Sequence, residues 1–283
     1  MDVQSFLAAI DDIFDGPLAD GRPHDARFAA VADDVVGFTT PAELAVLNLA
    51  ARLLPEGEAY LEVGTFKGRS LCGVLVGAPD RSYVAVENFS EFGMHTADSR
   101  RELERAVARH GSGRRTSLHD GDAFRILAEP NFVRDPIGAY FYDGAHTGLA
   151  HYLALGVAEP LLADEAVVLI DDASWPMVAA ATMRYVDRHP GWRVVRDIRA
   201  ESDHDQRWAN GLMILQYRRP PGQPRRMAHE VAIKRRWQIQ VRGPLTVLIW
   251  RALGRYPELV PLAKRLVRKG PRRVPDEVTP QQI

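Results

Sequence analysis

The chain has 283 residues, of which 46% are hydrophobic and 26% are charged, a composition typical of one large globular domain with appendages. Its single cysteine, Cys72, excludes a disulfide framework and a thiolate metal site. No cationic and apolar leader opens the sequence, and its apolar runs are too short to span a membrane. We therefore expect a protein of the reducing cytoplasm.

Two amphipathic helices are predicted before the first strand. Residues 2–15 place apolar side chains at helical spacing, and residues 41–54 show a second pattern of the same kind. We expect residues 1–55 to form a helical cap that shapes a lid over the domain that follows.

A strand and a glycine turn come next, at residues 60–70, which read Tyr-Leu-Glu-Val-Gly-Thr-Phe-Lys-Gly-Arg-Ser. Gly64 and Gly68 lack the Cβ atoms that would block a backbone turning tightly under a ligand. A helix then begins near Ser70, so the segment is typical of a nucleotide-binding loop. A purely structural turn is the alternative, because strand-to-helix turns favour glycine in any α/β protein.

Acidic residues follow the second and third predicted strands, near 82–86 and 115–118. Glu87 ends the second strand about twenty residues past the glycine turn, where a carboxylate can accept hydrogen bonds from both hydroxyls of a ribose. Asp122 lies beside Gly121 after the third strand. Each acid alone could be a solvated strand end, but their order along the chain favours a nucleoside site.

The fourth and fifth predicted strands, near 138–142 and 166–170, also end in acids. Asp143 follows the fourth strand, and Asp171 and Asp172 follow the fifth. The carboxyl ends of parallel strands form the rim where open α/β sheets bind ligands. Three carboxylates would repel one another there, and a hard divalent cation would relieve that repulsion. Alternatively, only Asp143 faces the ligand, and the other two cap the next helix.

This ordered set of motifs resembles the class I S-adenosylmethionine-dependent methyltransferases. Glu62-x-Gly64-x-x-x-Gly68 is similar to their first motif, and Tyr-Asp-Gly-Ala-His-Thr followed by a strand and Asp-Asp resembles the macrocin and aminocoumarin type of small-molecule O-methyltransferase. The resemblance covers residues 40–217. It implies a doubly wound, Rossmann-like, seven-stranded and mostly parallel sheet, whose last strand is antiparallel and belongs to a hairpin formed by residues 192–198 and 211–217.

The resemblance also implies a cofactor and its site. The cofactor is S-adenosylmethionine, with Asp122 placed to hold the adenine amino group. The implied cofactor-binding residues are Glu62, Gly64, Thr65, Gly68, Ser70, Glu87, Asp122 and Asp143. Aspartates at the positions of Asp143, Asp171 and Asp172 bind Mg²⁺ in that family, where the ion holds two substrate oxygens and lowers the pKa of the one to be methylated.

The chain departs from the family pattern at the general base. Metal-dependent sugar methyltransferases have a carboxylate two residues after the first metal ligand, whereas this chain has Ala145 there and His146 next. Imidazole can accept a proton near neutral pH, so His146, together with Asp143, is the candidate catalytic residue. The alternative is that His146 only makes a hydrogen bond at the start of the following helix.

The C-terminal segment differs in charge from the rest of the chain. From Arg218 onward there are sixteen Lys and Arg against four acids, whereas the preceding 217 residues hold 20 basic and 33 acidic residues. Residues 231–242 and 245–253 could form helices with apolar stripes beside arginines. Packing on the acidic body of the same chain or on a partner subunit, as a homo-oligomer, is favoured over binding to nucleic acid or a membrane surface.

The sequence thus predicts a methyltransferase that acts on a hydroxyl of a small natural product, such as a sugar or a polyketide. We expect a cap at 1–55, a cofactor-binding domain at 56–218, and a basic extension at 219–283 whose end, residues 271–283, is disordered. The alternative is a methyltransferase or binding module for RNA or a membrane-associated substrate that uses the basic extension. A steep salt dependence of polyanion binding would distinguish this alternative.

Overall fold

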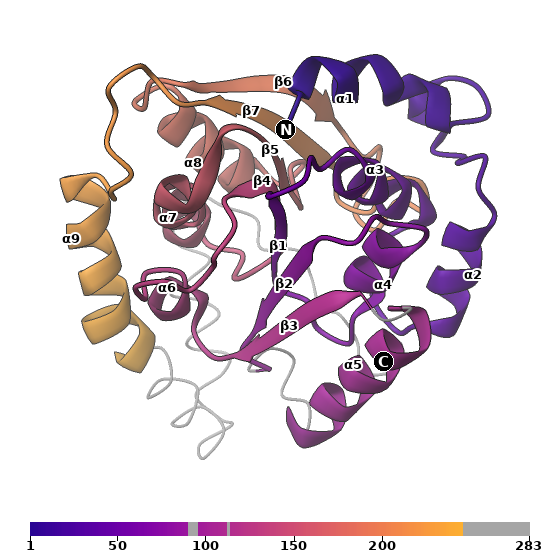
Figure 1. The fold of residues 1–283 in the computed structure, drawn as a ribbon, viewed down its shortest axis with the longest axis horizontal. Helices are drawn as coiled ribbons and strands as arrows, with labels where there is room; N and C mark the ends of the chain where they lie inside the picture. The colour runs from indigo at the N-terminus through magenta and orange to yellow at the C-terminus, as the bar shows by residue number, and fades with distance from the viewer. Residues whose placement is uncertain (90–95, 112–113, 246–283) are drawn as a thin grey trace. The chain divides into compact units, whose positions relative to one another are not determined.

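The computed structural model describes residues 1–89, 96–111 and 114–245. The chain divides into two compact units, Met1–Ala232 and Ile233–Ile283. The first unit is a seven-stranded sheet with helices on both faces (Figure 1). The expectations for a helix beyond residue 245 and for a disordered end at 271–283 concern residues outside the described part.

The strands confirm the predicted fold class. They are β1 (Ala59–Val63), β2 (Ser82–Glu87), β3 (Arg115–Asp120), β4 (Ile137–Tyr142), β5 (Leu162–Ile170), β6 (Trp192–Ile198) and β7 (Leu212–Arg218). Their order across the sheet is β3-β2-β1-β4-β5-β7-β6, and β7 alone runs antiparallel to its neighbours. The strand order reverses between β1 and β4, and open α/β sheets bind ligands at such a switch point.

The helices agree with the prediction less closely than the strands do. They are α1 (Val3–Ala9), α2 (Arg27–Asp34), α3 (Pro41–Arg52), α4 (Arg69–Leu75), α5 (Thr96–His110), α6 (Ala123–Ile126), α7 (Gly148–Ala158), α8 (Pro176–Val186) and α9 (His229–Trp237). The helix predicted over 2–15 ends at Ala9 and gives way to a 3-10 turn at Asp11–Ile13, since acids are unfavourable at a helix C-terminus. The sequence did not predict α2. No described helix has the length and apolarity needed to cross a bilayer.

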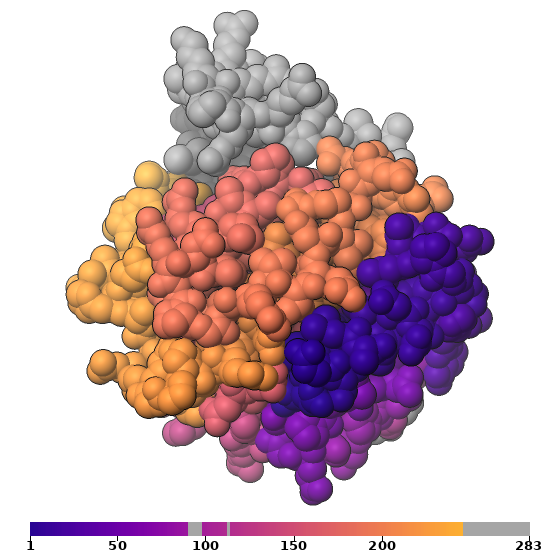
Figure 2. Space-filling view, turned by 90° about the horizontal axis from the view of Figure 1, so that it is seen from above, coloured from indigo at the N-terminus to yellow at the C-terminus, as the bar shows by residue number. Residues whose placement is uncertain are grey.

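The N-terminal segment packs on the loop between β6 and β7. Figure 2 shows these indigo residues lying against the orange part of the chain. The Trp208 indole N–H donates to the Leu18 carbonyl at 3.1 Å, and its ring lies 5.6 Å from that of Phe14. The Thr40 hydroxyl donates to the Arg207 carbonyl at 2.8 Å. Because Thr40 also caps α3, these contacts connect the cap to a loop on the ligand side of the sheet.

Candidate functional site

The glycine turn lies where three strand ends meet. Gly64 has a φ of +95°, and its N–H donates to the Val86 carbonyl at the end of β2 at 3.0 Å. A Cβ atom at Gly64 would overlap the carbonyl oxygen of Asp143, which follows β4. Gly68 starts α4 with a φ of +96°, and a Cβ there would lie 2.7 Å from a methyl group of Leu103. Backbone conformation therefore favours glycine at both positions, and the close approach of the Asp143 backbone also requires it at Gly64.

Three of the predicted cofactor residues are buried and stabilise the glycine turn. Glu62 is fully buried on β1 and accepts hydrogen bonds from the hydroxyls of Ser70 at 2.9 Å and Tyr60 at 3.1 Å. Burial raises the pKa of Glu62 to about 7, although hydrogen bonds from Thr65, Ser70 and Tyr60 oppose that rise. Glu62, Thr65 and Ser70 are all buried, so they shape the loop rather than line its surface.

Glu87 joins two loops at the end of β2. Its carboxylate accepts backbone N–H bonds from Phe66, Asn88 and Phe89, each at 2.7 Å. Phe66 and Phe89 both have positive φ angles, near 50°, so the two loops adopt unusual backbone conformations around this one acid. The half-buried Glu87 is thus held rigidly beside the glycine turn, at the position predicted for a ribose-binding residue.

A small open hollow lies beside Glu87. Leu118 and Asp120 of β3 line it together with Glu87, and so does Arg100 of α5, which pairs with Asp120 at 3.0 Å. Such a combination suits a nucleoside, which has an apolar base face and a polar ribose. Asp122 lies beyond β3 and caps α6, where its side chain accepts a hydrogen bond from the Arg125 N–H at 3.2 Å.

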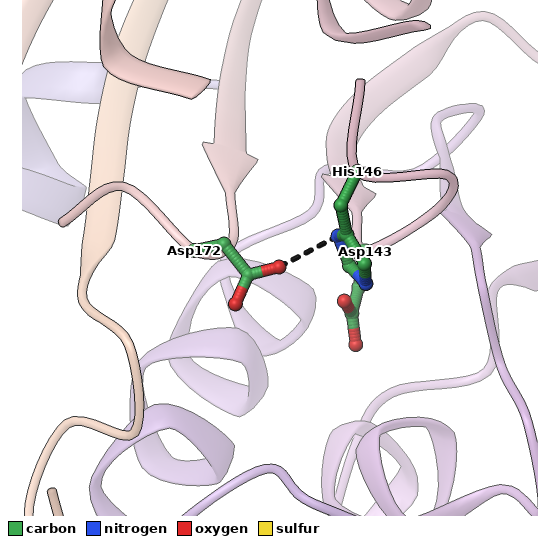
Figure 3. A group of neighbouring side chains, drawn as sticks. All are labelled: Asp143, His146 and Asp172. Carbon is green, nitrogen blue, oxygen red and sulfur yellow. Dashed lines mark ion pairs between the residues drawn. The ribbon is translucent and has the colours of Figure 1, made fainter. Parts of the chain in front are cut away.

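The rim formed by β4 and β5 brings Asp143, His146 and Asp172 together (Figure 3). Their ligand atoms all lie within 4.8 Å of one another. His146 Nδ1 lies 2.7 Å from Asp172 Oδ2, and the two side chains are 27% and 6% exposed. The pair is therefore shielded from bulk water on the Asp172 side but accessible on the His146 side.

Asp172 is oriented by a residue that sequence analysis did not identify. It has a φ of +54°, and its Oδ1 accepts a hydrogen bond from the Asn210 amide at 2.8 Å. Burial by itself raises the pKa of Asp172, but the bonds from His146 and Asn210 outweigh it and hold that pKa below its ordinary value. The Asn210 side-chain oxygen accepts from the His204 N–H at 2.9 Å, which ties the loop between β6 and β7 to the site.

Asp171 is turned away from this group. Its Oδ1 accepts the backbone N–H of Asp172 at 2.8 Å. Burial raises the pKa of Asp171 well above its ordinary value, with a further contribution from the negative charges of Glu43 and Asp172. Glu43 of α3 is itself buried, with a pKa raised to about 7 chiefly by burial. Among the described residues, the predicted triad therefore shares Asp143 and Asp172 with the observed group, in which His146 takes the third position.

His146 is held among aromatic rings and does not cap α7. The hydroxyl of Thr147 caps that helix by accepting the Ala150 N–H at 3.2 Å. The His146 ring lies edge-on to Trp175 at 5.3 Å and stacks at 6.4 Å over His151, which is buried. Burial, and then the charge of His146, lowers the pKa of His151 to about 3, so His151 is neutral.

The donor set of this group suits a divalent cation. Two carboxylates and an imidazole bind such ions in many proteins, with carboxylate oxygens preferred by Mg²⁺ and imidazole by transition metals. Asp172 already pairs with His146 and accepts a hydrogen bond from Asn210, so a bound cation would compete with both partners. The same three residues can also form a base oriented by a carboxylate.

Comparisons with known proteins agree with these observations. Residues 61–173 match the family model described as a methyltransferase domain. The O-methyltransferase from Bacillus cereus, solved with S-adenosylhomocysteine, is 15% identical, with a TM-score of 0.52 over 69% of this chain and 92% of that chain. TomG from Streptomyces achromogenes, an O-methyltransferase of tomaymycin synthesis solved with S-adenosylmethionine, is 18% identical, with a TM-score of 0.52 over 70% and 91%.

A protein from Corynebacterium glutamicum is 13% identical, with a TM-score of 0.54 over 78% of this chain and 100% of that chain. No protein of curated function matches the sequence. Residues 61–173 are thus similar to a methyltransferase domain, and the chain has the fold of the solved S-adenosylmethionine-dependent methyltransferases that its motifs resemble.

Proposed function

We propose that this protein transfers the methyl group of S-adenosylmethionine to a hydroxyl of a small natural product, such as a sugar or a polyketide. The observation that carries the proposal is the convergence of Asp143, His146 and Asp172 beside the Gly64 turn. The cofactor would lie over that turn, with its ribose at Glu87 and its methionine end toward Asp143. Two proteins of the same fold were solved with this cofactor or its product, which supports the choice of cofactor.

In this proposal His146 takes the proton of the acceptor hydroxyl. Asp172 Oδ2 lies 2.7 Å from Nδ1, where it would hold the ring with its proton on Nδ1 and its lone pair on Nε2. The acceptor oxygen attacks the methyl carbon in line with the sulfonium, the carbon–sulfur bond breaks, and the hydroxyl proton passes to Nε2. The products are a methyl ether and S-adenosylhomocysteine. We also propose a cytoplasmic location, which the lone free cysteine, Cys72, supports because the chain has no partner for a disulfide.

Glu87→Gln tests the cofactor site. We expect this substitution to weaken S-adenosylmethionine binding more than tenfold, or about 1.5–3 kcal/mol, because a charged acceptor of hydrogen bonds is replaced by a neutral one. Titration calorimetry measures the affinity. Glu56→Gln is the matched control, since it makes the same change at an exposed residue that does not line the hollow, and it should keep wild-type affinity. An unchanged affinity in Glu87→Gln, in a protein with wild-type thermal stability, would remove Glu87 from the site.

Removal of divalent cations tests the second part of the proposal, in which Mg²⁺ assists the reaction. Asp143 and Asp172 would hold the ion, which when bound would lower the pKa of the acceptor hydroxyl. We expect excess chelator to abolish turnover without changing cofactor affinity, and added Mg²⁺ to restore it. Asp143→Asn should lose activity, whereas Asp171→Asn should keep its cation dependence because Asp171 lies outside the group.

Full turnover in excess chelator, with negligible metal confirmed by elemental analysis, would show that no ion takes part. Proton removal would then rest on His146 and Asp172 alone. Activity that is lost in Asp171→Asn as well as in Asp143→Asn would favour the ligand assignment predicted from the sequence, which contains both residues, over the one that the structure suggests.

A further inference from the structure

The described part of the second unit, residues 233–245, carries a row of exposed apolar side chains. The row consists of Ile233, Trp237, Val241 and Leu245, with exposed fractions of 56%, 50%, 48% and 53%. Large apolar side chains this exposed are ordinary when scattered, but four at a constant spacing of four residues form a continuous stripe. We call these four residues the apolar stripe.

A change in helix type keeps the stripe on one side. In an α-helix, residues four apart differ by about 40° around the axis, so a row at this spacing drifts around the helix. Residues Gln238–Arg242 form a π-helix, which has more residues per turn. Going from Ile233 to Trp237, the side-chain direction turns one way around the helix axis. Going from Trp237 to Val241, it therefore turns the other way. The two rotations offset each other, so Ile233 and Val241 lie on the same side of the helix.

Positive charge accompanies the stripe. Residues 233–245 contain Lys234, Arg235, Arg236 and Arg242 and no acid. The whole second unit, residues 233–283, has twelve Lys and Arg against three acids. An apolar stripe flanked by basic residues is the pattern of helices that lie in the plane of a membrane surface.

We propose that residues 233–245 bind the surface of an anionic lipid bilayer, with the apolar stripe at the acyl boundary and the basic side chains at the headgroup phosphates. Lipid fits better than nucleic acid, because Ile233, Val241 and Leu245 are aliphatic and cannot stack on bases. Their transfer from water into the acyl region of a bilayer, in contrast, is favourable. Lipid also fits better than a second copy of this segment, because pairing two stripes would bring like charges together. Anionic headgroups neutralise those charges.

Co-sedimentation of the full chain with lipid vesicles tests this proposal, which is independent of methyl transfer. We expect binding to vesicles of phosphatidylcholine with phosphatidylglycerol and little binding to phosphatidylcholine alone. Added salt should weaken the binding, because it screens the attraction between basic side chains and headgroups. Tryptophan emission should move to shorter wavelength on binding as Trp237 leaves water.

Matched variants separate the apolar stripe from the charge. Trp237→Gln combined with Val241→Gln, which leaves the net charge unchanged, should weaken partitioning to anionic vesicles by roughly tenfold or more. Arg235→Gln combined with Arg236→Gln should weaken it at low salt by roughly tenfold. Val36→Gln combined with Met183→Gln is the control, since it makes the same number of polar substitutions at exposed apolar residues of the first unit. If the stripe variant does not fold, Val241→Gln alone should give a smaller loss in the same direction.

Several results would overturn the proposal. One is failure to sediment with anionic vesicles. Another is full binding by the stripe variant, which would assign the attachment to charge alone. A dimer in lipid-free solution that the stripe variant abolishes would make the stripe a contact between copies. Binding of a single-stranded RNA oligonucleotide that depends on the stripe and exceeds vesicle binding would make the segment an RNA surface.

Discussion

His146→Ala is expected to lower turnover by about 10²–10⁴-fold, because it removes a positioned base from the acceptor hydroxyl. Cofactor affinity and thermal stability should stay near those of the wild type, since Thr147, not His146, caps α7 and the His146 ring is partly exposed. The measurement is the rate of S-adenosylhomocysteine release at saturating cofactor. The wild-type rate should rise with pH as the imidazole loses its proton, and the variant should lose that dependence.

Two further variants make this result specific. Asp172→Asn removes the charge that orients Nδ1 and should also lower the rate, with the protein still folded. His204→Asn is a matched control, because His204 is an exposed histidine near the site with a φ of +57°, a conformation that asparagine tolerates. It should keep wild-type turnover. Wild-type turnover in His146→Ala would instead favour an alkoxide activated by a cation, and loss of activity through unfolding would make His146 structural.

Gly64→Ala is expected to reduce the free energy of unfolding by about 3–5 kcal/mol. Two costs combine at this position: a positive φ that alanine adopts only with strain, and a Cβ that overlaps the Asp143 carbonyl oxygen. The backbone of β4 cannot move away easily, because the Asp143 N–H donates to the Val63 carbonyl of β1 at 2.9 Å. Denaturant unfolding measures the change, and cofactor affinity should fall with it.

Gly57→Ala provides the control for this experiment. Gly57 has a φ of +80°, but a Cβ there meets nothing within 4 Å. Gly57→Ala should therefore reduce the free energy of unfolding only by the backbone strain, which is about 1–2 kcal/mol. Equal losses in the two variants would show that the approach of Gly64 to Asp143 contributes nothing to stability.

The sequence by itself determined the sheet and the set of strand ends that carry polar residues. Strand periodicity and length predicted β2, β4, β6 and β7 to within a residue at each end, because their apolar runs are bounded by turn residues or charge. The same logic placed Asp143 and Asp172 on one rim, since parallel strands end at the same edge of a sheet. Helix ends were less predictable, as the early end of α1 at Ala9 shows, because capping and charge compete with periodicity there.

Only the tertiary structure decided which groups meet at that rim. Asp171 and Asp172 are adjacent and chemically identical, yet a φ of +54° turns Asp172 toward His146 while Asp171 bonds to the backbone. Asn210 and Glu43 reach the same place from a distant loop and from α3. Local sequence encodes strand and turn preferences, which act over a few residues. The contacts of the site join segments far apart in the chain, so they depend on how the whole fold packs.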